Sequence, residues 1–214
     1  YGGVRARLEL CDVHSEKGFG MFAGASKVWM NSCRIHDTGF SRALVRDEES
    51  LLVADKTEFV GSKQCGLLIG AVANAVLTDC HVHGNVMRGV QISEGAIVQV
   101  IRCVVEQNRE IGMAAAKSTV KFDSCRVFEN GGSGIAVMQE SKGEIVRCEL
   151  HRNKIFGAFF AENAEGGITE CLIVENQGGG VATKSAVSIT RNKLVRNSGG
   201  ISIRGKGTSP ILSE

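Results

Sequence analysis

A unit of 21 to 24 residues recurs along almost the whole chain, and this period restricts the fold more than any other feature. In its clearest copy, Cys148 is followed by Leu150 at plus two, Asn153 at plus five and Gly157 at plus nine. The first position of each unit is occupied in turn by Cys11, Cys33, Thr57, Cys80, Cys103, Cys125, Cys148, Cys171 and Asn192. A fixed period of this length indicates a solenoid of stacked units.

Within each unit, apolar residues alternate with period two over short stretches, as at Val98 and Val100 or at Cys103 and Val105. This alternation is typical of a strand, whereas a helical repeat needs an apolar stripe with a period of 3.6 residues. We therefore predict an all-β fold, a single-stranded right-handed parallel β-helix of about nine coils with three short strands each. The right hand follows from the general preference of parallel crossover connections.

The Cys at the first position and the Asn at plus five each keep one phase, so coils stacked at about 4.8 Å place like side chains over one another. We predict an internal cysteine ladder and an internal asparagine ladder, the second made by Asn85, Asn108, Asn130, Asn153, Asn176 and Asn197. Asn is expected at the turn itself, because it tolerates left-handed dihedrals and bonds to turn backbone. The Gly at plus nine is expected where the backbone bends closely.

Seven of the eight cysteines share the inward phase, and only Cys65 is out of register. Cysteine behaves as a small apolar residue in a core, so a ladder of reduced thiols is favoured over disulfides. Reduced thiols are usual in a reducing compartment, which predicts an intracellular, cytoplasmic protein.

The repeat is continuous, which predicts one β-helix domain over residues 1–214. The chain begins at Tyr1 and shows no cap over its outer coils, so we expect a fragment of a longer chain, or open ends that associate end to end. With 25 basic and 23 acidic residues, it lacks the basic character of a nucleic-acid binder. No apolar run reaches the roughly 18 residues that cross a membrane.

The last regular unit and its continuation contain Arg191, Asn192, Lys193, Leu194, Asn197, Ile201, Ile203, Ser209, Pro210, Ile211 and Leu212. This pattern resembles the repeats of right-handed β-helix domains of the pectin-lyase-like superfamily. It is most similar to the arrays of β-helical F-box proteins, related eukaryotic scaffold proteins and periplasmic copper-maturation proteins. The resemblance implies the fold and is poor evidence for function. Cys stands here where those repeats often have Asn, and no F-box segment accompanies them.

Enzymes with this fold act on the outer face of one sheet, and the resemblance implies clustered aspartates with calcium or a basic residue in such a site. No close aspartate pair is predicted here. The charged insertion of the irregular third coil, with Arg46, Asp47, Glu48 and Glu49, is the remaining candidate catalytic group. A solvated charged turn is the simpler interpretation, so catalysis is not favoured and no cofactor is expected.

Histidines recur at plus three, on the outward side of the strand after the Cys. His14 and His36 occupy this position on adjacent coils, and Asp12 or Asp37 could complete a three-ligand metal site with them. Exposed cross-strand stacking of the two rings is the alternative.

The position at plus eleven carries large apolar residues that are predicted to face outward. Phe22, Leu44, Leu68 and Phe159 belong to this column. Exposed apolar patches usually mark contacts, so the column is a candidate docking strip for a protein partner. The alternative is that loops, or a segment outside this sequence, cover it.

Together these features favour a non-catalytic binding or scaffold module that engages a protein partner through an outer sheet face or open solenoid ends. Two alternatives stay open: a carbohydrate-active β-helix (polysaccharide lyase, hydrolase or epimerase) and a structural element of a large assembly. The fold alone does not decide between them. Binding or activity on acidic polysaccharides would discriminate.

Overall fold

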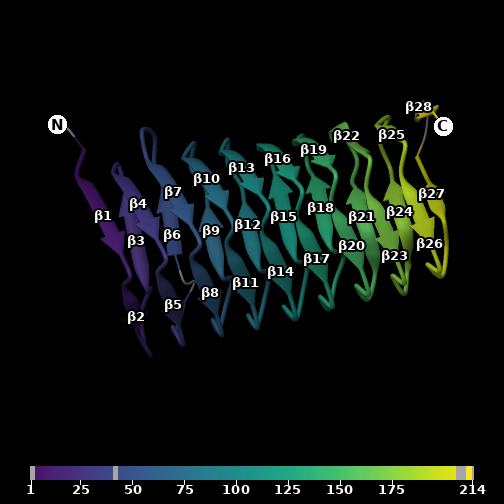
Figure 1. Cartoon of the computed structure of the whole chain (residues 1–214). Coiled ribbons are helices and arrows are strands. Elements are labelled where there is room, and N and C mark those ends of the chain that lie inside the picture. Colours follow the sequence, from purple (N-terminus) through teal and green to yellow (C-terminus); the bar gives the residue numbers. More distant parts are fainter. Residues whose placement is uncertain (1–2, 41–42, 206–210, 214) are drawn as a thin grey trace.

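The computed structural model describes residues 3–40, 43–205 and 211–213, so Ser209 and Pro210 of the last repeat lie outside the described residues. The described residues form 28 strands, and they contain no helix that is long and apolar enough to cross a membrane. The strands make three parallel sheets that run side by side along the molecule (Figure 1). Each coil contributes one strand to each sheet in turn.

Sheet A has ten strands and contains the first strand of each coil. Its members are β1 (Arg5–Glu9), β4 (Lys27–Asn31), β7 (Leu51–Asp55), β10 (Asn74–Thr78), β13 (Ile97–Ile101), β16 (Thr119–Asp123), β19 (Lys142–Val146), β22 (Glu165–Thr169), β25 (Ser188–Thr190) and β28 (Ile211–Ser213).

Sheet B has nine strands, and each begins directly after the first position of its unit, which is Cys in all but two of them. Its members are β2 (Asp12–His14), β5 (Arg34–His36), β8 (Glu58–Val60), β11 (His81–His83), β14 (Val104–Glu106), β17 (Arg126–Phe128), β20 (Glu149–His151), β23 (Leu172–Val174) and β26 (Lys193–Val195).

Sheet C has nine strands and closes each coil. Its members are β3 (Met21–Gly24), β6 (Ala43–Arg46), β9 (Leu67–Ile69), β12 (Val90–Ile92), β15 (Met113–Ala116), β18 (Ile135–Met138), β21 (Phe156–Phe160), β24 (Gly179–Thr183) and β27 (Ile201–Ile203). The predicted all-β solenoid with three short strands in each coil is confirmed.

The core is one continuous apolar column between the three sheets. Inward and outward residues alternate along most strands, so that Val98 and Val100 of β13 are buried while Ile97 and Gln99 are exposed. Phe122 is among the largest fully buried side chains. Burial of this kind stabilises the fold by roughly 25 cal/mol for each Å² of apolar surface removed from water.

Two corners of the coils each place one residue in the left-handed backbone region, the second of them from the second coil onward. The Cys corner, between sheets A and B, has this residue just before the ladder Cys, as at Arg102 (φ 51°). The Asn corner, between sheets B and C, has it just before the ladder Asn, as at Gln107 (φ 52°) and Glu129 (φ 54°). The expectation that Asn itself adopts the left-handed conformation is therefore wrong. The preceding residue turns the chain, and the Asn side chain points inward.

The asparagine ladder is a continuous column of side-chain amides inside the Asn corner. Asn130 is fully buried, and its Nδ2 donates to Oδ1 of Asn153 at 3.0 Å and to the Val105 carbonyl at 3.2 Å. Its own Oδ1 accepts from Nδ2 of Asn108 at 3.0 Å and from the Asn108 backbone N–H at 3.1 Å. Each amide thus ties together consecutive coils and satisfies corner backbone that has no strand partner.

The cysteine ladder occupies the Cys corner with weaker contacts. Sγ of Cys125 donates to the carbonyls of Asp123 and Val100 at 3.4 and 3.3 Å. A thiol hydrogen bond with Cys125 and burial together raise the pKa of Cys103 to about 12. All eight cysteines are free thiols.

The Gly at plus nine is required by close packing. A Cβ on Gly134 would lie 2.7 Å from the Gly157 carbonyl oxygen and 2.8 Å from Nδ2 of Asn153. The asparagine ladder therefore sits directly beside a backbone that has no room for a side chain.

Candidate functional sites

The outer face of sheet B carries a dense group of titratable side chains on the strands β8, β11 and β14. Three strands with two outward positions each form a grid of six residues. The strand pairing sets Glu58 beside His81, and Glu106 beside His83. Val60 and Val104 occupy the two remaining corners.

The hydrogen bonds in this grid run along its diagonals. Nε2 of His81 lies 2.8 Å from Oε1 of Glu106, and Nε2 of His83 lies 2.8 Å from Oε1 of Glu58. The two imidazole rings stack with their centroids 4.1 Å apart. All four side chains are half-buried.

Arg34 of β5 completes the group. Its Nε lies 2.8 Å from Oε2 of Glu58, so the two carboxylate oxygens of Glu58 have different partners. Burial raises the pKa of Glu58, but the hydrogen bonds from His83 and Arg34 and their positive charge outweigh this and lower the pKa overall. The Glu58 carboxylate is therefore held in its ionised form.

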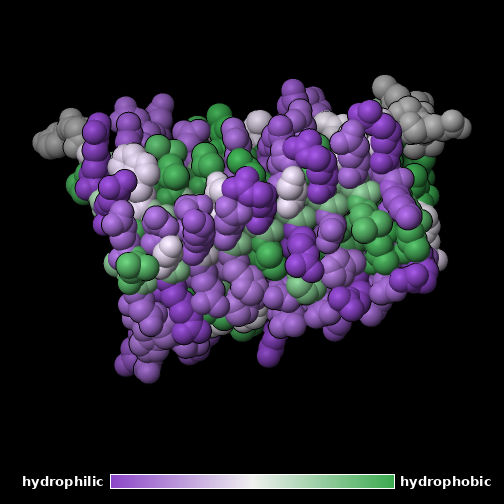
Figure 2. Space-filling model, viewed as in Figure 1, coloured by the Kyte–Doolittle hydropathy of each residue, from purple (hydrophilic) through white to green (hydrophobic). Residues whose placement is uncertain are grey.

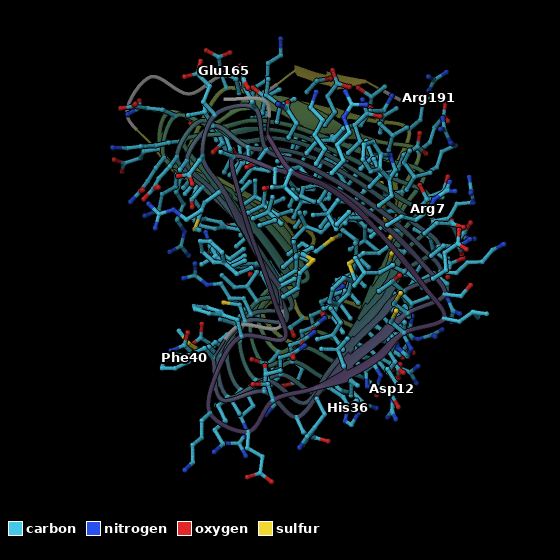
Figure 3. The ribbon with its side chains drawn as sticks, turned by 90° about the vertical axis from the view of Figure 1, so that its left-hand side faces the viewer. Arg7, Asp12, His36, Phe40, Glu165 and Arg191 are labelled. Atoms are coloured by element: carbon cyan, nitrogen blue, oxygen red, sulfur yellow. The ribbon has the colours of Figure 1, made fainter. Side chains whose placement is uncertain are left out.

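The predicted metal-ligand pair lies on the same sheet, two coils closer to the N-terminus. The His14 and His36 ring centroids are 5.2 Å apart, and ligand atoms of His14, His36 and Asp37 lie within 4.8 Å of one another. Both ring nitrogens of His36 already face carboxylates, Nε2 at 3.0 Å from Asp12 and Nδ1 at 2.8 Å from Asp37. Figure 3 shows Asp12 and His36 together at one edge of the coil. His14, Asp37 and Lys63 also line a hollow of about 500 Å³.

Further along sheet B the outer face changes character. His151 stacks on Phe128 with the centroids 4.6 Å apart, and burial together with Arg152 and Arg126 lowers the pKa of its imidazole. Near β23 and β26 the surface becomes hydrophobic, where Leu172 is exposed (Figure 2).

The predicted docking strip lies on sheet C, but it does not form one continuous surface. Phe22, Leu44 and Leu68 lie on consecutive strands, whereas Phe159 is four strands away from Leu68. Phe22 is 58% exposed, and the other three side chains are half-buried. Between Leu68 and Phe159 the column contains Gln91, Ala114 and Ala136, and both alanines are fully buried.

Each end of this column has an aromatic group of its own. At the N-terminal end, Phe19 lies 6.2 Å from Phe22 and 5.5 Å from Phe40, centroid to centroid, and all three are exposed. Phe40 projects from the side of the coil opposite to Asp12 in Figure 3. At the C-terminal end, Phe156 and Phe159 stack with their centroids 6.1 Å apart.

A cavity of about 310 Å³ opens beside the second aromatic pair. It lies over β21, β24 and β27, and its lining includes Phe156, Phe159, Lys184, Ser202 and Arg204. Lys184 and Arg204 are both exposed.

Of the candidate catalytic residues, Arg46 ends β6, and Asp47, Glu48 and Glu49 lie in the turn that follows. Nε of Arg46 lies 3.2 Å from Oδ1 of Asp47, while Glu48 and Glu49 are exposed. The turn contains two left-handed residues, Asp47 (φ 81°) and Glu49 (φ 69°). Among the described residues, no hydrogen bond or ion pair joins Glu48 or Glu49 to the other two, so the structure does not bring the four together.

Sequence reasoning missed Glu58 and Glu106 as partners of His81 and His83, and it missed Lys184 and Arg204. The first group could have been found by considering the plus-one and plus-three positions of neighbouring units together, because both face outward. For the second group, no sequence signal marks a turn cation as unpaired.

Solved structures similar to this chain include two epimerases and a pectate lyase. The A-module of a mannuronan C-5 epimerase from Azotobacter vinelandii aligns with a TM-score of 0.66 and 13% identity over 91% of this chain and 64% of that one. The periplasmic alginate epimerase AlgG gives 0.61 and 15%, over 86% and 49%. Pectate lyase Pel9A gives 0.56 and 12%, over 94% and 70%. The chain thus spans about half to two thirds of the two epimerase chains.

At these identities the likeness shows the fold alone. No curated protein matches the chain significantly. The predicted relation to F-box and eukaryotic scaffold arrays stays a prediction.

A family model described as right handed beta helix region matches residues 1–120 and 112–198. The two matches together include almost the whole chain and the sites described above, except Ser202 and Arg204 of the cavity. They also confirm the predicted right hand of the solenoid. The chain belongs to the right-handed β-helix family.

Proposed function

We propose that this chain is a carbohydrate-binding β-helix that holds an acidic polysaccharide on sheet C, at the cavity over β21, β24 and β27. The observation that carries the proposal is that two cations without a described ion pair, Lys184 and Arg204, line the same cavity as two phenylalanines. Lys184 and Arg204 continue adjacent strands past Thr183 and Ile203, which are direct partners. Neither forms an ion pair within the part of the chain that the structure describes.

Most other arginines near the corners of the coils differ in this respect. Arg102 pairs with Asp79 at 2.8 Å, and Arg147 pairs with Asp123 at 2.6 Å. Arg191 and Arg196 are likewise paired with glutamates of the preceding coil. Lys184 and Arg204 are therefore charges available to a ligand, and both line a cavity that also contains Phe156 and Phe159.

The cavity combines the two features that a uronic acid requires. A sugar ring has an apolar face that packs on aromatic side chains, and Phe156 and Phe159 supply such a surface. A uronate also carries a carboxylate, which Arg and Lys recognise by charge-assisted hydrogen bonds. Ser202 adds a hydroxyl to the same lining.

The comparisons support an acidic polymer in particular. Alginate, mannuronan and pectate, after which the similar proteins are named, are all polymers of uronic acids. The cavity lining contains Lys184 and Arg204 as its only charged groups among the described residues, and no carboxylate or imidazole. Its chemistry therefore favours binding over acid–base catalysis.

The test is a titration calorimetry series with alginate and polygalacturonate oligosaccharides, and with a neutral glucan as a control ligand. Lys184→Ala combined with Arg204→Ala is expected to weaken acidic-oligosaccharide binding at least tenfold, and Phe159→Ala severalfold. Lys121→Ala, an exposed cation on sheet A, is the matched control and should leave the affinity unchanged. Equal binding of the neutral glucan, or no loss in the double variant, would overturn the proposal.

A second candidate function is a protein contact at the N-terminal end of sheet C. The exposed group of Phe19, Phe22 and Phe40 favours it, since clustered exposed aromatics are enriched in interfaces. Phe22→Asp should abolish capture of a protein partner by the intact chain, whereas Phe159→Asp should not. Both variants losing the same partner would point to the whole strip instead. A cytoplasmic location and end-to-end association stay predictions.

A further inference from the structure

We propose that Glu58, His81, His83 and Glu106 on sheet B form a binding site for a divalent transition-metal ion, and that Zn²⁺ suits it best. Imidazole nitrogens and carboxylate oxygens together are typical zinc ligands. The ligand atoms of Glu58, His81 and His83 lie within 4.8 Å of one another. Glu106 adds a fourth, with its Oε1 2.8 Å from Nε2 of His81.

The spacing is close to that of a coordinated ion. Ligands at about 2.0 to 2.2 Å from a tetrahedral zinc are separated from one another by roughly 3.3 Å. The carboxylate–imidazole distances of 2.8 Å are slightly shorter than this, and all the ligand atoms of Glu58, His81 and His83 lie within 4.8 Å of one another. Small side-chain rotations therefore suffice, while the three strands stay in place.

The surrounding side chains hold these ligands in position. Arg34 binds Oε2 of Glu58 and leaves Oε1 directed at His83, which is the arrangement of an outer partner that orients a metal-binding carboxylate. The stacked rings of His81 and His83 limit each other's rotation. Val60 and Val104 fill the other two corners of the grid with apolar groups.

The donor set also suits a dication. The two carboxylates supply oxygen ligands and the two imidazoles supply nitrogen ligands, as zinc prefers. The ion would take the place of the two imidazole–carboxylate hydrogen bonds, with both Nε2 atoms facing it.

The second group on this sheet, His14, His36 and Asp37, is less suited. The His14 side chain is 48% exposed, and both nitrogens of His36 already have carboxylate partners. A substitution of His14 therefore serves as the comparison for a substitution of His83 in the experiment.

The experiment is calorimetric titration of the whole metal-free chain with Zn²⁺, with Co²⁺ absorption as a second readout of imidazole–carboxylate coordination. We expect one ion per chain. His83→Ala and His81→Ala should each weaken binding at least tenfold, and Arg34→Ala about tenfold, as for an outer partner of a ligand. His151→Ala, on the same face but stacked on Phe128, should leave the affinity unchanged.

Circular dichroism of each metal-free variant separates loss of binding from loss of fold. If His83→Ala does not fold, Glu58→Gln keeps the shape of the side chain and should still weaken binding at least tenfold. Two results would overturn the proposal: no saturable binding of Zn²⁺ by the folded chain, or binding that is lost in His14→Ala and kept in His83→Ala.

Discussion

The Cys corner and the Asn corner of each coil share one backbone geometry but differ in their interior chemistry. At both, a single left-handed residue turns the chain and the next side chain points inward. Such a residue costs roughly 1 kcal/mol when it is not glycine. At the Asn corner a column of amide hydrogen bonds offsets this cost, and at the Cys corner weak thiol bonds and close packing do so. The difference implies that the Asn corner contributes far more to stability.

Replacing one ladder amide should have the largest effect. Asn130→Leu leaves the Asn108 backbone N–H and the Val105 carbonyl without their side-chain partner. Each such buried group costs roughly 1 to 3 kcal/mol, so the loss should be about 4 kcal/mol. Chemical denaturation measures it. Asn74→Leu, at an exposed position of β10, is the control and should change stability by less than about 0.5 kcal/mol. Similar losses in both variants would refute the role of the ladder.

Crowding the asparagine ladder at the Gly of plus nine should have the next largest effect. Gly134→Ala brings a Cβ to 2.7 Å from the Gly157 carbonyl oxygen, and the resulting shift should cost about 2 kcal/mol. Gly200→Ala is the matched control, because no atom lies within 4 Å of a Cβ placed there. A thermal melt that ranks Gly200→Ala as the more destabilised variant would contradict the packing argument.

The same experiment at the Cys corner should give a smaller change. Cys125→Ala removes a buried sulfur and its weak bonds to Asp123 and Val100, with an expected loss of about 1 kcal/mol. If this variant loses as much stability as Asn130→Leu under the same denaturant, the two corners are equivalent and the comparison fails.

The smallest expected effect is on the pH dependence of stability. Of the two corners, only the Cys corner should show it. Cys125 lowers the pKa of Cys148, but Cys171 and burial outweigh this and raise it to about 12, as for Cys103. A raised thiol pKa favours the folded state below about 9, the ordinary value, and this contribution is lost as the pH rises toward 12. The melting temperature should fall over this window, and less steeply in Cys103→Ala. If the melting temperatures of the unmodified protein and of Cys103→Ala fall equally over this pH range, the thiols do not cause the pH dependence.

The inward positions could be predicted from sequence because a stacked core requires the same kind of side chain at the same position of each coil. The ladder of Asn130 and its equivalents followed from phase alone. The left-handed residues could not be predicted, since Arg102, Glu129 and Leu10 have no preference for that region. Their conformation is imposed by the strands on either side of the corner.

The candidate sites on sheet B were likewise predicted only in part. His14 and His36 were placed correctly because they share a phase on adjacent coils. The pairs of Glu58 and Glu106 with the histidines of β11 were missed because they run diagonally across the sheet. Diagonal contacts depend on side-chain rotamers, which a one-dimensional repeat does not encode.

The asparagine column also has a direction. From Asn85 to Asn176, each Nδ2 donates to the Oδ1 of the next coil toward the C-terminus. The amide dipoles therefore add along the axis, as peptide dipoles do in a helix. At one end a backbone N–H of Ser62 meets the Oδ1 of Asn85, and at the other the Nδ2 of Asn197 turns back to the Ile173 carbonyl. The solenoid therefore has a direction along its axis, as a polar filament does. Each coil donates a hydrogen bond at this corner, so the next coil must provide an acceptor oxygen there.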